Sequence, residues 1–467
     1  MRVLWLVNIM LPAYAKAKGL PYSVREGWLS GSFDRISKDI KLNNDIKNNK
    51  EDSETAMPKN QGSLVELGVA FPFPDGAVDN TGVKPEIIDG VSFYKFNENL
   101  NTPEIYDEQL ESEMKSIIDN FRPDIIHIFG TEFPHTLAMT RAFNRPDRTL
   151  IGIQGICSVI ADKYLEGLPQ SVRNAKTFRD RIKKDSLQDQ VAKYRLRGQN
   201  ETEAIRNAGH ITGRTDFDRE ETARINPDAQ YHFMNETMRD IFYKPLDADA
   251  RSHVRPYSIM LSQGDYPLKG FHYVLEALPE IIKVHPETKL YVAGNSIVGN
   301  IDRSEVTGDT DGAEYRGSRY PFFLRASAYG KYLRKLIRDN NLQDHVVVLG
   351  KLSAEQMKDQ MLRSSIFVCP STVENSPNSL AEAMLLGVPV VAARTGGIPS
   401  MVTDGREGYL FEPGNIEEFT KAILNAFDEK VITDLYCENA QKRAFKDHDA
   451  DTNFNRLIEI YRDIYNG

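Results

Sequence analysis

The chain is poor in the residues from which covalent or metal cross-links are built. Its 467 residues include 3 cysteines, Cys157, Cys369 and Cys437, which lie far apart and form no C-x-x-C pair. A disulfide framework is therefore excluded, and we expect buried free thiols in a reducing compartment. No His, Cys, Asp or Glu spacing typical of a metal site is present either, so we expect no bound metal.

Long apolar runs are missing as well. No segment approaches the roughly 20 apolar residues that a membrane-spanning helix needs. The opening stretch, MRVLWLVNIMLPAYA, ends in Ala13-Tyr14-Ala15, which imitates a signal-peptidase site. Because Asn8 interrupts the apolar run, we interpret it as a buried first strand of a parallel sheet. We expect a cytoplasmic protein.

An excess of positive charge is also absent. The formal net charge is −9, which argues against a general nucleic-acid binder. No G-x-G-x-x-G sequence follows a predicted strand, which argues against a nicotinamide dehydrogenase. Nothing indicates a tightly bound cofactor, so we expect none.

What the sequence does contain is an alternation of short β-branched runs with longer amphipathic stretches, typical of parallel sheets covered by helices. A chain of this length favours two domains. We predict domains at residues 1–245 and 246–450, followed by a C-terminal helix at 451–467 that packs back on the first domain. The predicted strands are Val3–Ile9, Val65–Phe71, Val91–Phe96, Ile125–Phe129, Leu150–Gln154, His210–Gly213, Tyr257–Ser262, Lys289–Ala293, Val346–Leu349, Ile366–Cys369, Val388–Ala392 and Gly408–Phe411.

The stretch VENSPNSLAEAMLLGVPVVAARTGG, residues 373–397, carries two glutamates on either side of a predicted helix start. Pro377 suits the first turn of a helix, and Gly387 with Pro389 ends it. We expect Asn375, Ser376 or Asn378 to cap this helix. The backbone N–H groups of Asn378, Ser379 and Leu380 then point beyond the carboxyl edge of the sheet, where phosphate or sugar oxygens bind.

Glu382 lies on this helix and Glu374 precedes it, so both carboxylates face the same space. No lysine or arginine stands three or four residues from Glu382 to neutralise it. Paired ribose hydroxyls would supply the hydrogen bonds that a buried carboxylate needs. The alternative is a glutamate placed only to complement the helix dipole, and the two acids alone leave both interpretations open.

Together with the downstream GVPVVAARTGGIPSMVTDGREGYLF, this stretch resembles the E-x7-E motif of the retaining glycosyltransferase family 4. The resemblance continues in VVVLGKLSAEQM, PLKGFHYVLEALPEI and, in the first half, PDIIHIFGTEFPHTLAM. It implies the GT-B fold, in which two Rossmann-like, doubly wound α/β domains face each other across a cleft. The second domain would bind a nucleotide-sugar donor and the first an acceptor.

The resemblance also implies roles for single residues. Lys269 would bind the donor's phosphates, Glu382 the ribose, and Glu374 the hydroxyls of the transferred sugar. Backbone groups around Leu352 would meet the base, and those of 378–380 the phosphate or sugar.

One departure from the family pattern concerns the phosphate site. The arginine that usually stands five residues before the lysine is replaced by Gly264. Arg316, Arg319 and Arg325 are candidates for its substitute. Asp309 and Asp311 form a D-x-D sequence, which we interpret as a solvated loop rather than a metal site.

In the first domain the resemblance points to three residues. Gly27 stands where a glycine-rich loop approaches the donor, and a loop glycine without a special role is equally compatible. His127, at the end of the strand Ile125–Phe129, is a catalytic candidate, although a histidine at a strand end is more often structural. Gln154 replaces a histidine found near the reacting sugar in many relatives, and we assign it to substrate contact.

The function implied is transfer of a hexosyl or N-acetylhexosaminyl group from a nucleotide-sugar, UDP-linked by preference, to a saccharide or lipid-diphosphate-linked acceptor in cell-surface polysaccharide synthesis. The anomeric configuration would be retained by front-face displacement, without a metal. A phosphorylase or sucrose-type synthase of similar architecture, and a non-catalytic sugar-nucleotide-binding relative, remain alternatives.

The segment 171–198 is unusually basic, with nine Lys or Arg against three Asp. A solvated helix face is one interpretation. The other is peripheral contact with anionic lipid at the inner face of the plasma membrane.

Overall fold

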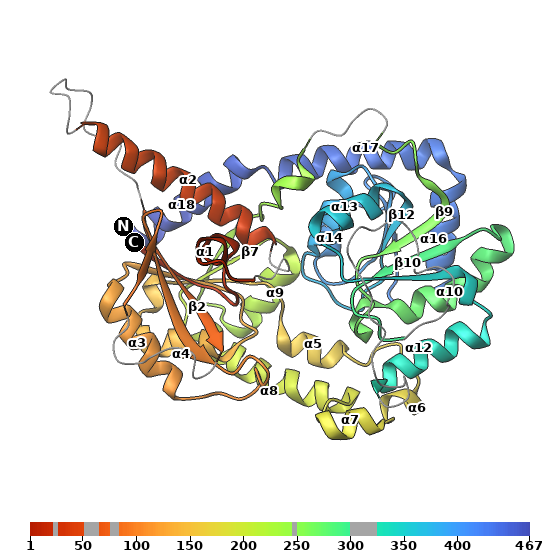
Figure 1. The fold of residues 1–467 in the computed structure, drawn as a ribbon, viewed down its shortest axis with the longest axis horizontal. Coiled ribbons are helices and arrows are strands. Elements are labelled where there is room, and N and C mark those ends of the chain that lie inside the picture. Colours follow the sequence, from red (N-terminus) through yellow and green to blue (C-terminus); the bar gives the residue numbers. More distant parts are fainter. Residues whose placement is uncertain (22–26, 51–64, 75–83, 245–249, 299–324) are drawn as a thin grey trace. The chain divides into compact units, whose positions relative to one another are not determined.

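The computed structural model describes the chain except residues 22–26, 51–64, 75–83, 245–249 and 299–324. The chain forms two compact units (Figure 1). The first unit comprises Met1–Ser158, Tyr194–Arg239 and Asp447–Gly467, and the second comprises Val159–Lys193 and Asp240–Lys446.

The predicted boundaries lie at residues 245 and 450. The main difference from them is that Val159–Lys193, which lies inside the predicted first domain, belongs to the second unit. The Asp180 carboxylate accepts a hydrogen bond from the backbone N–H of Ala328 at 3.0 Å. Gly167 packs directly against the Tyr273 hydroxyl, where a Cβ atom would lie 2.0 Å away. These contacts attach the segment to helices of the second unit.

The first unit contains an eight-stranded sheet in the order β3-β4-β2-β1-β5-β6-β7-β8. All neighbouring strands run parallel except β3, which pairs with β4 in the antiparallel direction. The central strand β5 is fully buried, as expected of a strand covered on both faces. The strands are β1 (Arg2–Leu6), β2 (Glu66–Pro74), β3 (Glu86–Ile88), β4 (Val91–Glu98), β5 (Ile125–Phe129), β6 (Thr149–Gly152), β7 (His210–Gly213) and β8 (Gln230–Phe233).

Helices cover the sheet of the first unit with apolar faces. α18 lies beside α2 (Figure 1), where Arg35 forms an ion pair with Asp451 at 2.7 Å and packs over the Phe454 ring. Tyr461 of α18 accepts a hydrogen bond from the Trp5 indole N–H of β1 at 2.8 Å. The helices are α1 (Pro12–Lys18), α2 (Gly27–Lys50), α3 (Gln109–Phe121), α4 (Pro134–Phe143), η1 (Pro146–Arg148), α9 (Asp216–Ile225) and α18 (Ala450–Asn466); α5 (Cys157–Lys163) and α8 (Leu187–Arg206) run across the unit boundary.

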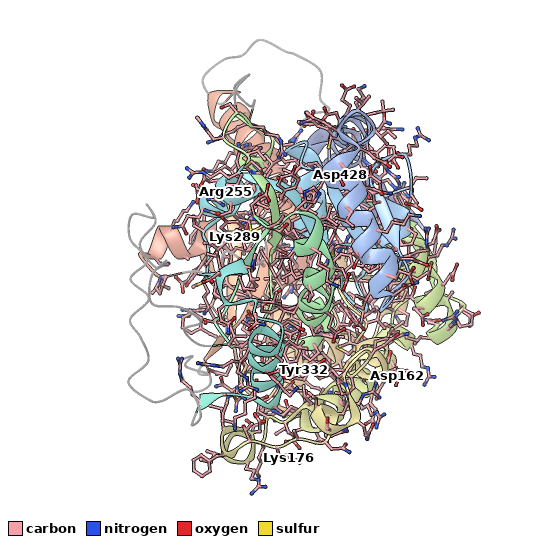
Figure 2. The ribbon with its side chains drawn as sticks, turned by 90° about the vertical axis from the view of Figure 1, so that its right-hand side faces the viewer. Asp162, Lys176, Arg255, Lys289, Tyr332 and Asp428 are labelled. Atoms are coloured by element: carbon pink, nitrogen blue, oxygen red, sulfur yellow. The ribbon has the colours of Figure 1, made fainter. Side chains whose placement is uncertain are left out.

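The second unit contains a six-stranded parallel sheet in the order β11-β10-β9-β12-β13-β14. This is the doubly wound order, and the direction of winding reverses between β9 and β12. Figure 2 labels Arg255 and Lys289 where β9 and β10 begin, so the carboxyl ends lie at the opposite edge. The strands are β9 (Arg255–Leu261), β10 (Lys289–Ala293), β11 (Val346–Gly350), β12 (Ser364–Cys369), β13 (Val390–Ala393) and β14 (Tyr409–Phe411).

Several helices of the second unit begin at a residue whose side chain caps the helix. Ser353 and Gln356 form a capping box at the start of α13, and Asn415 caps α16 through its side chain. The helices are α6 (Gln170–Arg173), α7 (Phe178–Lys183), η2 (Asp240–Phe242), η3 (Pro267–Lys269), α10 (Phe271–Val284), α12 (Ala328–Asp339), η4 (Gln343–His345), α13 (Ala354–Leu362), α14 (Asn378–Leu385), α15 (Ile398–Met401), α16 (Ile416–Asp428) and α17 (Lys430–Asp447).

All of the predicted strands are present, and the predicted fold class of two parallel-sheet α/β units is confirmed. Two strands, β3 and β8, were not predicted. Across the described parts of the chain, no helix combines the length and hydropathy needed to cross a membrane.

Candidate functional site

The predicted donor residues gather at the carboxyl edge of the second sheet, where the winding reverses. Lys269 ends η3, which follows β9, and Glu374 lies in the loop after the neighbouring strand β12. In open α/β sheets this reversal leaves a crevice in which ligands bind. Two predicted site residues from opposite halves of the domain are therefore brought together by the strand order.

Lys269 and Glu374 form an ion pair, with 2.5 Å between the lysine Nζ and the glutamate Oε1. The same Oε1 accepts a hydrogen bond from the Ser371 hydroxyl at 2.8 Å. Burial disfavours the charged ammonium, but the facing carboxylate outweighs this effect and raises the pKa of Lys269 above its ordinary value. Lys269 is therefore a cation at every physiological pH, and Glu374 balances its charge.

The loops that carry this pair are tied together by close backbone contacts. The N–H of Thr372 donates to the carbonyl of Leu268 at 2.9 Å. Gly270 has φ +70°, and a Cβ on it would lie 2.0 Å from the Pro370 carbonyl oxygen. The Glu374 carbonyl is covered by Gly396, where a Cβ would lie 1.8 Å from that oxygen. These contacts fix the position of both charged side chains.

Helix α14 begins next to the ion pair. The capping prediction is wrong, because Pro377 is the N-cap residue and no side chain caps the helix. Ser379 instead accepts a hydrogen bond from the Ser262 hydroxyl at 3.1 Å, and Asn378 Oδ1 is buried without a hydrogen-bond partner among the described residues. The N–H of Leu380 donates to the Pro377 carbonyl at 2.9 Å, so of the three predicted groups only those of Asn378 and Ser379 remain available to a ligand.

Glu382 lies one turn further along α14 and is only 4% exposed. Its neighbours on the helix include the buried Leu385 and Leu386. Leu352, the predicted base contact, follows β11 and directly precedes Ser353, the N-cap of α13. It is half-buried at the same carboxyl edge.

The position of the missing family arginine has no room for a side chain. A Cβ at Gly264 would lie 2.8 Å from both Phe271 Cδ1 and Val292 Cγ1. Of the candidate substitutes, Arg316 and Arg319 lie outside the described residues, as does the D-x-D sequence. Arg325 is half-buried, and its Nε has no hydrogen-bond partner in the described structure.

No group of three His, Cys, Asp or Glu side chains among the described residues is arranged to hold a metal ion. The carboxyl edge of the second sheet presents the Lys269 cation, its counter-ion Glu374 and backbone N–H groups at the start of α14. Such a combination stabilises negative charge on phosphate oxygens.

The three residues predicted in the first unit occupy different settings. Gly27 is the first residue of α2. Gln154 follows β6, and its amide donates to the Glu236 carboxylate at 2.8 Å. His127 is fully buried within β5, which lowers the pKa of its imidazole to about 3. His127 is therefore uncharged at neutral pH, and its catalytic role stays a prediction.

His127 and Gln154 line one pocket, at the carboxyl ends of β5 to β8 beneath α2 and α18. Sequence reasoning missed two charged residues in this pocket, Arg214 and Glu236, which form an ion pair at 2.8 Å and are nearly fully buried. Both lie just after strands, where ligand-binding side chains of open sheets are found. Glu236 was missed because β8, the strand that precedes it, was not predicted from the sequence.

Comparison with known proteins supports this description. Residues 250–446 match the model of the family described as glycosyl transferases group 1. A curated relative, the GDP-mannose-dependent alpha-(1-6)-phosphatidylinositol monomannoside mannosyltransferase of Mycolicibacterium smegmatis, is 26% identical over 192 residues, which cover 38% of this chain and 42% of the relative. The chain spans less than half the length of such curated relatives.

Solved structures match over the whole chain. Sucrose-phosphate synthase from Thermosynechococcus elongatus is 13% identical with a TM-score of 0.64, and the match covers 100% of this chain and 99% of the synthase. HepE from Anabaena, in complex with UDP-glucose, is 17% identical with a TM-score of 0.61, covering 99% and 100%. At this level of identity the likeness establishes the fold, which is GT-B.

Proposed function

We propose that this chain, whose residues 250–446 match the glycosyl transferases group 1 model, transfers a sugar from a nucleotide-sugar donor to a saccharide or lipid-linked saccharide acceptor. The observation that carries the proposal is the cluster of Lys269, Glu374 and the uncapped start of α14 at the reversal between β9 and β12. A cation beside free helix N–H groups suits a diphosphate.

The donor would lie across this cluster. Its diphosphate would contact Lys269 and the N–H groups of Asn378 and Ser379, and Glu382 would accept hydrogen bonds from the ribose hydroxyls. Glu374, held by Lys269 and Ser371, would contact hydroxyls of the transferred sugar. The backbone near Leu352 would meet the base, and Gly27 would allow the α2 start to approach the donor.

The reaction we propose retains the anomeric configuration. The acceptor oxygen attacks on the face from which the diphosphate departs, and the departing diphosphate accepts the acceptor's proton. Lys269 and the helix N–H groups stabilise the charge that develops on the leaving group. On this account no metal and no cofactor is needed, because the fixed cation takes the electrostatic role.

UDP is the donor nucleotide that we propose by preference. HepE, which shares the fold, binds UDP-glucose, whereas the mannosyltransferase relative uses GDP-mannose. The transferred group would be a hexosyl or N-acetylhexosaminyl unit, and the product a cell-surface polysaccharide or its lipid-diphosphate-linked precursor.

The proposed place of action is the cytoplasmic face of the plasma membrane. The basic segment 171–198, which includes Lys176 (Figure 2), exposes two apolar side chains on α7, Phe178 at 61% and Ile182 at 67%. Lys183 and Lys184 at the end of α7 have no ion-pair partner among the described residues. Apolar side chains ringed by free cations suit an anionic lipid surface.

Co-sedimentation with anionic vesicles tests the membrane contact. We expect salt-sensitive binding that is lost when Lys183 and Lys184 are both replaced by Glu. The double variant Lys430→Glu, Lys442→Glu on α17 carries the same charge change at exposed positions and should still bind. Equal loss in both variants, or no binding by the native protein, would exclude a specific lipid contact.

Product analysis tests the transfer reaction itself. The protein would be incubated with UDP-glucose, UDP-N-acetylglucosamine or GDP-mannose and a panel of saccharide acceptors, with and without EDTA. We expect proton NMR to show a product with the donor's anomeric configuration, at a rate that EDTA leaves unchanged. Turnover that requires free phosphate, or nucleotide binding without turnover, would contradict the proposal in favour of a phosphorylase or a binding protein.

A further inference from the structure

Helix α17 of the second unit (Figure 1) exposes large apolar side chains along one face. Val431 is 84% exposed, Leu435 54% and Phe445 43%. The opposite face packs onto the unit with small residues, among them the buried Ala440 and Ala444. Apolar residues scattered singly over a surface are common, whereas a row of them along one helix points to a contact with another molecule.

The exposed row has the spacing of a contact between two helices. It consists of five exposed residues at alternating intervals of four and three, Val431, Leu435, Glu438, Lys442 and Phe445, which we call the α17 stripe. These intervals average 3.5 residues, the repeat that keeps a row of side chains facing a second helix. The centre of the stripe carries one acid and one base, so it does not suit an anionic lipid surface.

The order of residues along the stripe selects the partner. Leu435 and Phe445 stand five residues on either side of Ala440, and Glu438 and Lys442 stand two residues on either side of it. In an antiparallel pair of identical helices centred at Ala440, Leu435 of one copy would face Phe445 of the other, and Glu438 would face Lys442. Each apolar residue then meets an apolar residue and each acid meets a base. A parallel pair would instead place like charges opposite each other.

The charges beside the stripe follow the same symmetry. Asp434 and Lys446 are exposed and stand six residues on either side of Ala440, so they would also face each other in the antiparallel pair. Within one chain, Lys442 Nζ already lies 3.6 Å from Glu438 Oε2. In the pair, these four central charges would form a ring of alternating sign, in which every charge lies beside opposite charges.

We propose that the α17 stripe binds the same stripe of a second copy of this chain, antiparallel about a two-fold axis at the level of Ala440. Such a contact requires a surface that is complementary to itself, and the stripe meets this requirement in both its apolar and its charged residues. A single helix pair is a small interface, so the dimer is reversible, with a dissociation constant on the order of 10 μM. The inference does not depend on the proposed function, because no residue of the stripe belongs to the donor site.

Sedimentation velocity of the full chain, in a reducing buffer and over roughly 1 to 200 μM, tests the association. We expect a monomer at the lowest concentration that converts to a dimer at the highest. A monomer at every concentration would overturn the inference, including one that binds anionic vesicles through Leu435 instead. A larger open oligomer would also overturn it, because a contact between identical surfaces closes at two copies.

Leu435→Glu tests whether the stripe is the contact. It places a carboxylate opposite the Phe445 ring of the other copy, twice in each dimer, and we expect dimerisation at least about tenfold weaker. Val284→Glu is the matched control, because Val284 is also 54% exposed but lies at the end of α10, outside the stripe. It should dimerise like the native protein. Equal dimerisation in the two variants would overturn the inference.

Exchange of the two central charges tests the pairing. Glu438→Lys places a lysine opposite Lys442 of the other copy, and Lys442→Glu places a glutamate opposite Glu438, so each variant alone should dimerise about tenfold more weakly. The double variant restores both opposite pairs and should dimerise like the native protein, and a mixture of the two single variants should form a mixed dimer. Failure of the double variant to recover, at a native unfolding temperature, would overturn the inference.

Neutralising one charge tests the direction of the two helices. In the antiparallel pair, Glu438→Gln removes an attraction and should weaken the dimer by about two- to tenfold. In a parallel pair, the same change would relieve the repulsion between the two copies of Glu438 and strengthen the dimer. A tighter dimer in Glu438→Gln would therefore overturn the antiparallel contact.

Discussion

Lys269 already has an anionic partner, Glu374, and this contact would affect how a donor binds. Its ammonium contacts Glu374 Oε1, which also accepts from Ser371. An incoming diphosphate would meet a cation that is positioned in advance, because the two loops that carry the pair are tied through Thr372 and Leu268. Little reorganisation is then required as negative charge develops on the leaving group.

Removing the cation should therefore affect turnover more than folding. We expect Lys269→Ala to lower kcat by about 10²- to 10³-fold, the range seen when one electrostatic contact to a developing anion is lost. Lys358→Ala, a control in the same unit, removes a lysine that donates to the Ile241 carbonyl instead. Initial-rate kinetics would check both variants, and a Lys269→Ala enzyme with native kcat would remove the lysine from the mechanism.

At the scale of elements, much of the second sheet was predictable. Buried parallel strands are continuous apolar runs, and the end of α14 is marked by Gly387, which has φ +63°. The start of α14 was harder to predict, because Ser379 accepts a hydrogen bond from Ser262, more than a hundred residues away, and does not cap the helix. β8 was missed because Gln230–Phe233 mixes polar and aromatic residues and only one of its four residues is buried.

The candidate site could be predicted only where a motif is continuous in sequence. Glu374 and Glu382 share one stretch, and Lys269 belongs to another that resembles the same family. The pairing of Arg214 with Glu236 and the attachment of Asp180 to Ala328 depend on contacts between distant segments. No periodicity in the sequence records such contacts.

The loop after β13 supports Glu374, and a single glycine tests this. Gly396→Ala forces φ +51° on a residue with a Cβ, which would overlap the Glu374 carbonyl. We expect loss of more than about 1 kcal/mol of stability, the usual cost of a left-handed alanine, together with at least tenfold lower activity. Denaturant titration and initial rates measure the two effects.

Gly405→Ala is the matched control, because Gly405 has φ +70° but its Cβ would approach only the Tyr436 hydroxyl, at 3.6 Å. It should show the stability cost without the loss of activity. Equal activity in the two variants would show that the Gly396 contact does not position Glu374.

At the scale of the whole molecule, each unit carries its own polar site at the carboxyl ends of its strands. The second unit presents a cation and helix N–H groups suited to a diphosphate, and the first holds the Arg214–Glu236 ion pair beside the uncharged His127.

Buried histidines in both units make stability sensitive to acid. Burial lowers the pKa of His127 and His272 to about 3 and that of His232 to about 4. These residues stay neutral in the folded chain but take up protons in the unfolded chain below its pKa of about 6.5. Stability should therefore fall as pH drops from about 6.5 toward 4, by about 1.4 kcal/mol per pH unit for each histidine.

Urea titrations between pH 7 and pH 4.5 would measure this slope. His272→Phe, in the second unit, should reduce it, and the slope rather than the absolute stability is the quantity to compare. Because the raised pKa of buried Glu201, about 7, contributes a slope of the opposite sign, a slope that is the same in His272→Phe and the native protein is the result that would contradict the role of His272.

If the proposed function is right, the second unit binds a nucleoside diphosphate through Glu382 and its neighbours. Thermal unfolding with UDP, GDP, ADP or phosphate, on the native protein, Glu382→Ala and the buried control Glu407→Ala, tests it most directly. At about 100 times its dissociation constant a ligand adds roughly 2.7 kcal/mol. We expect UDP or GDP to stabilise the native protein and Glu407→Ala but not Glu382→Ala. Stabilisation by phosphate alone, or an undiminished shift in Glu382→Ala, would rule out Glu382 as the ribose ligand.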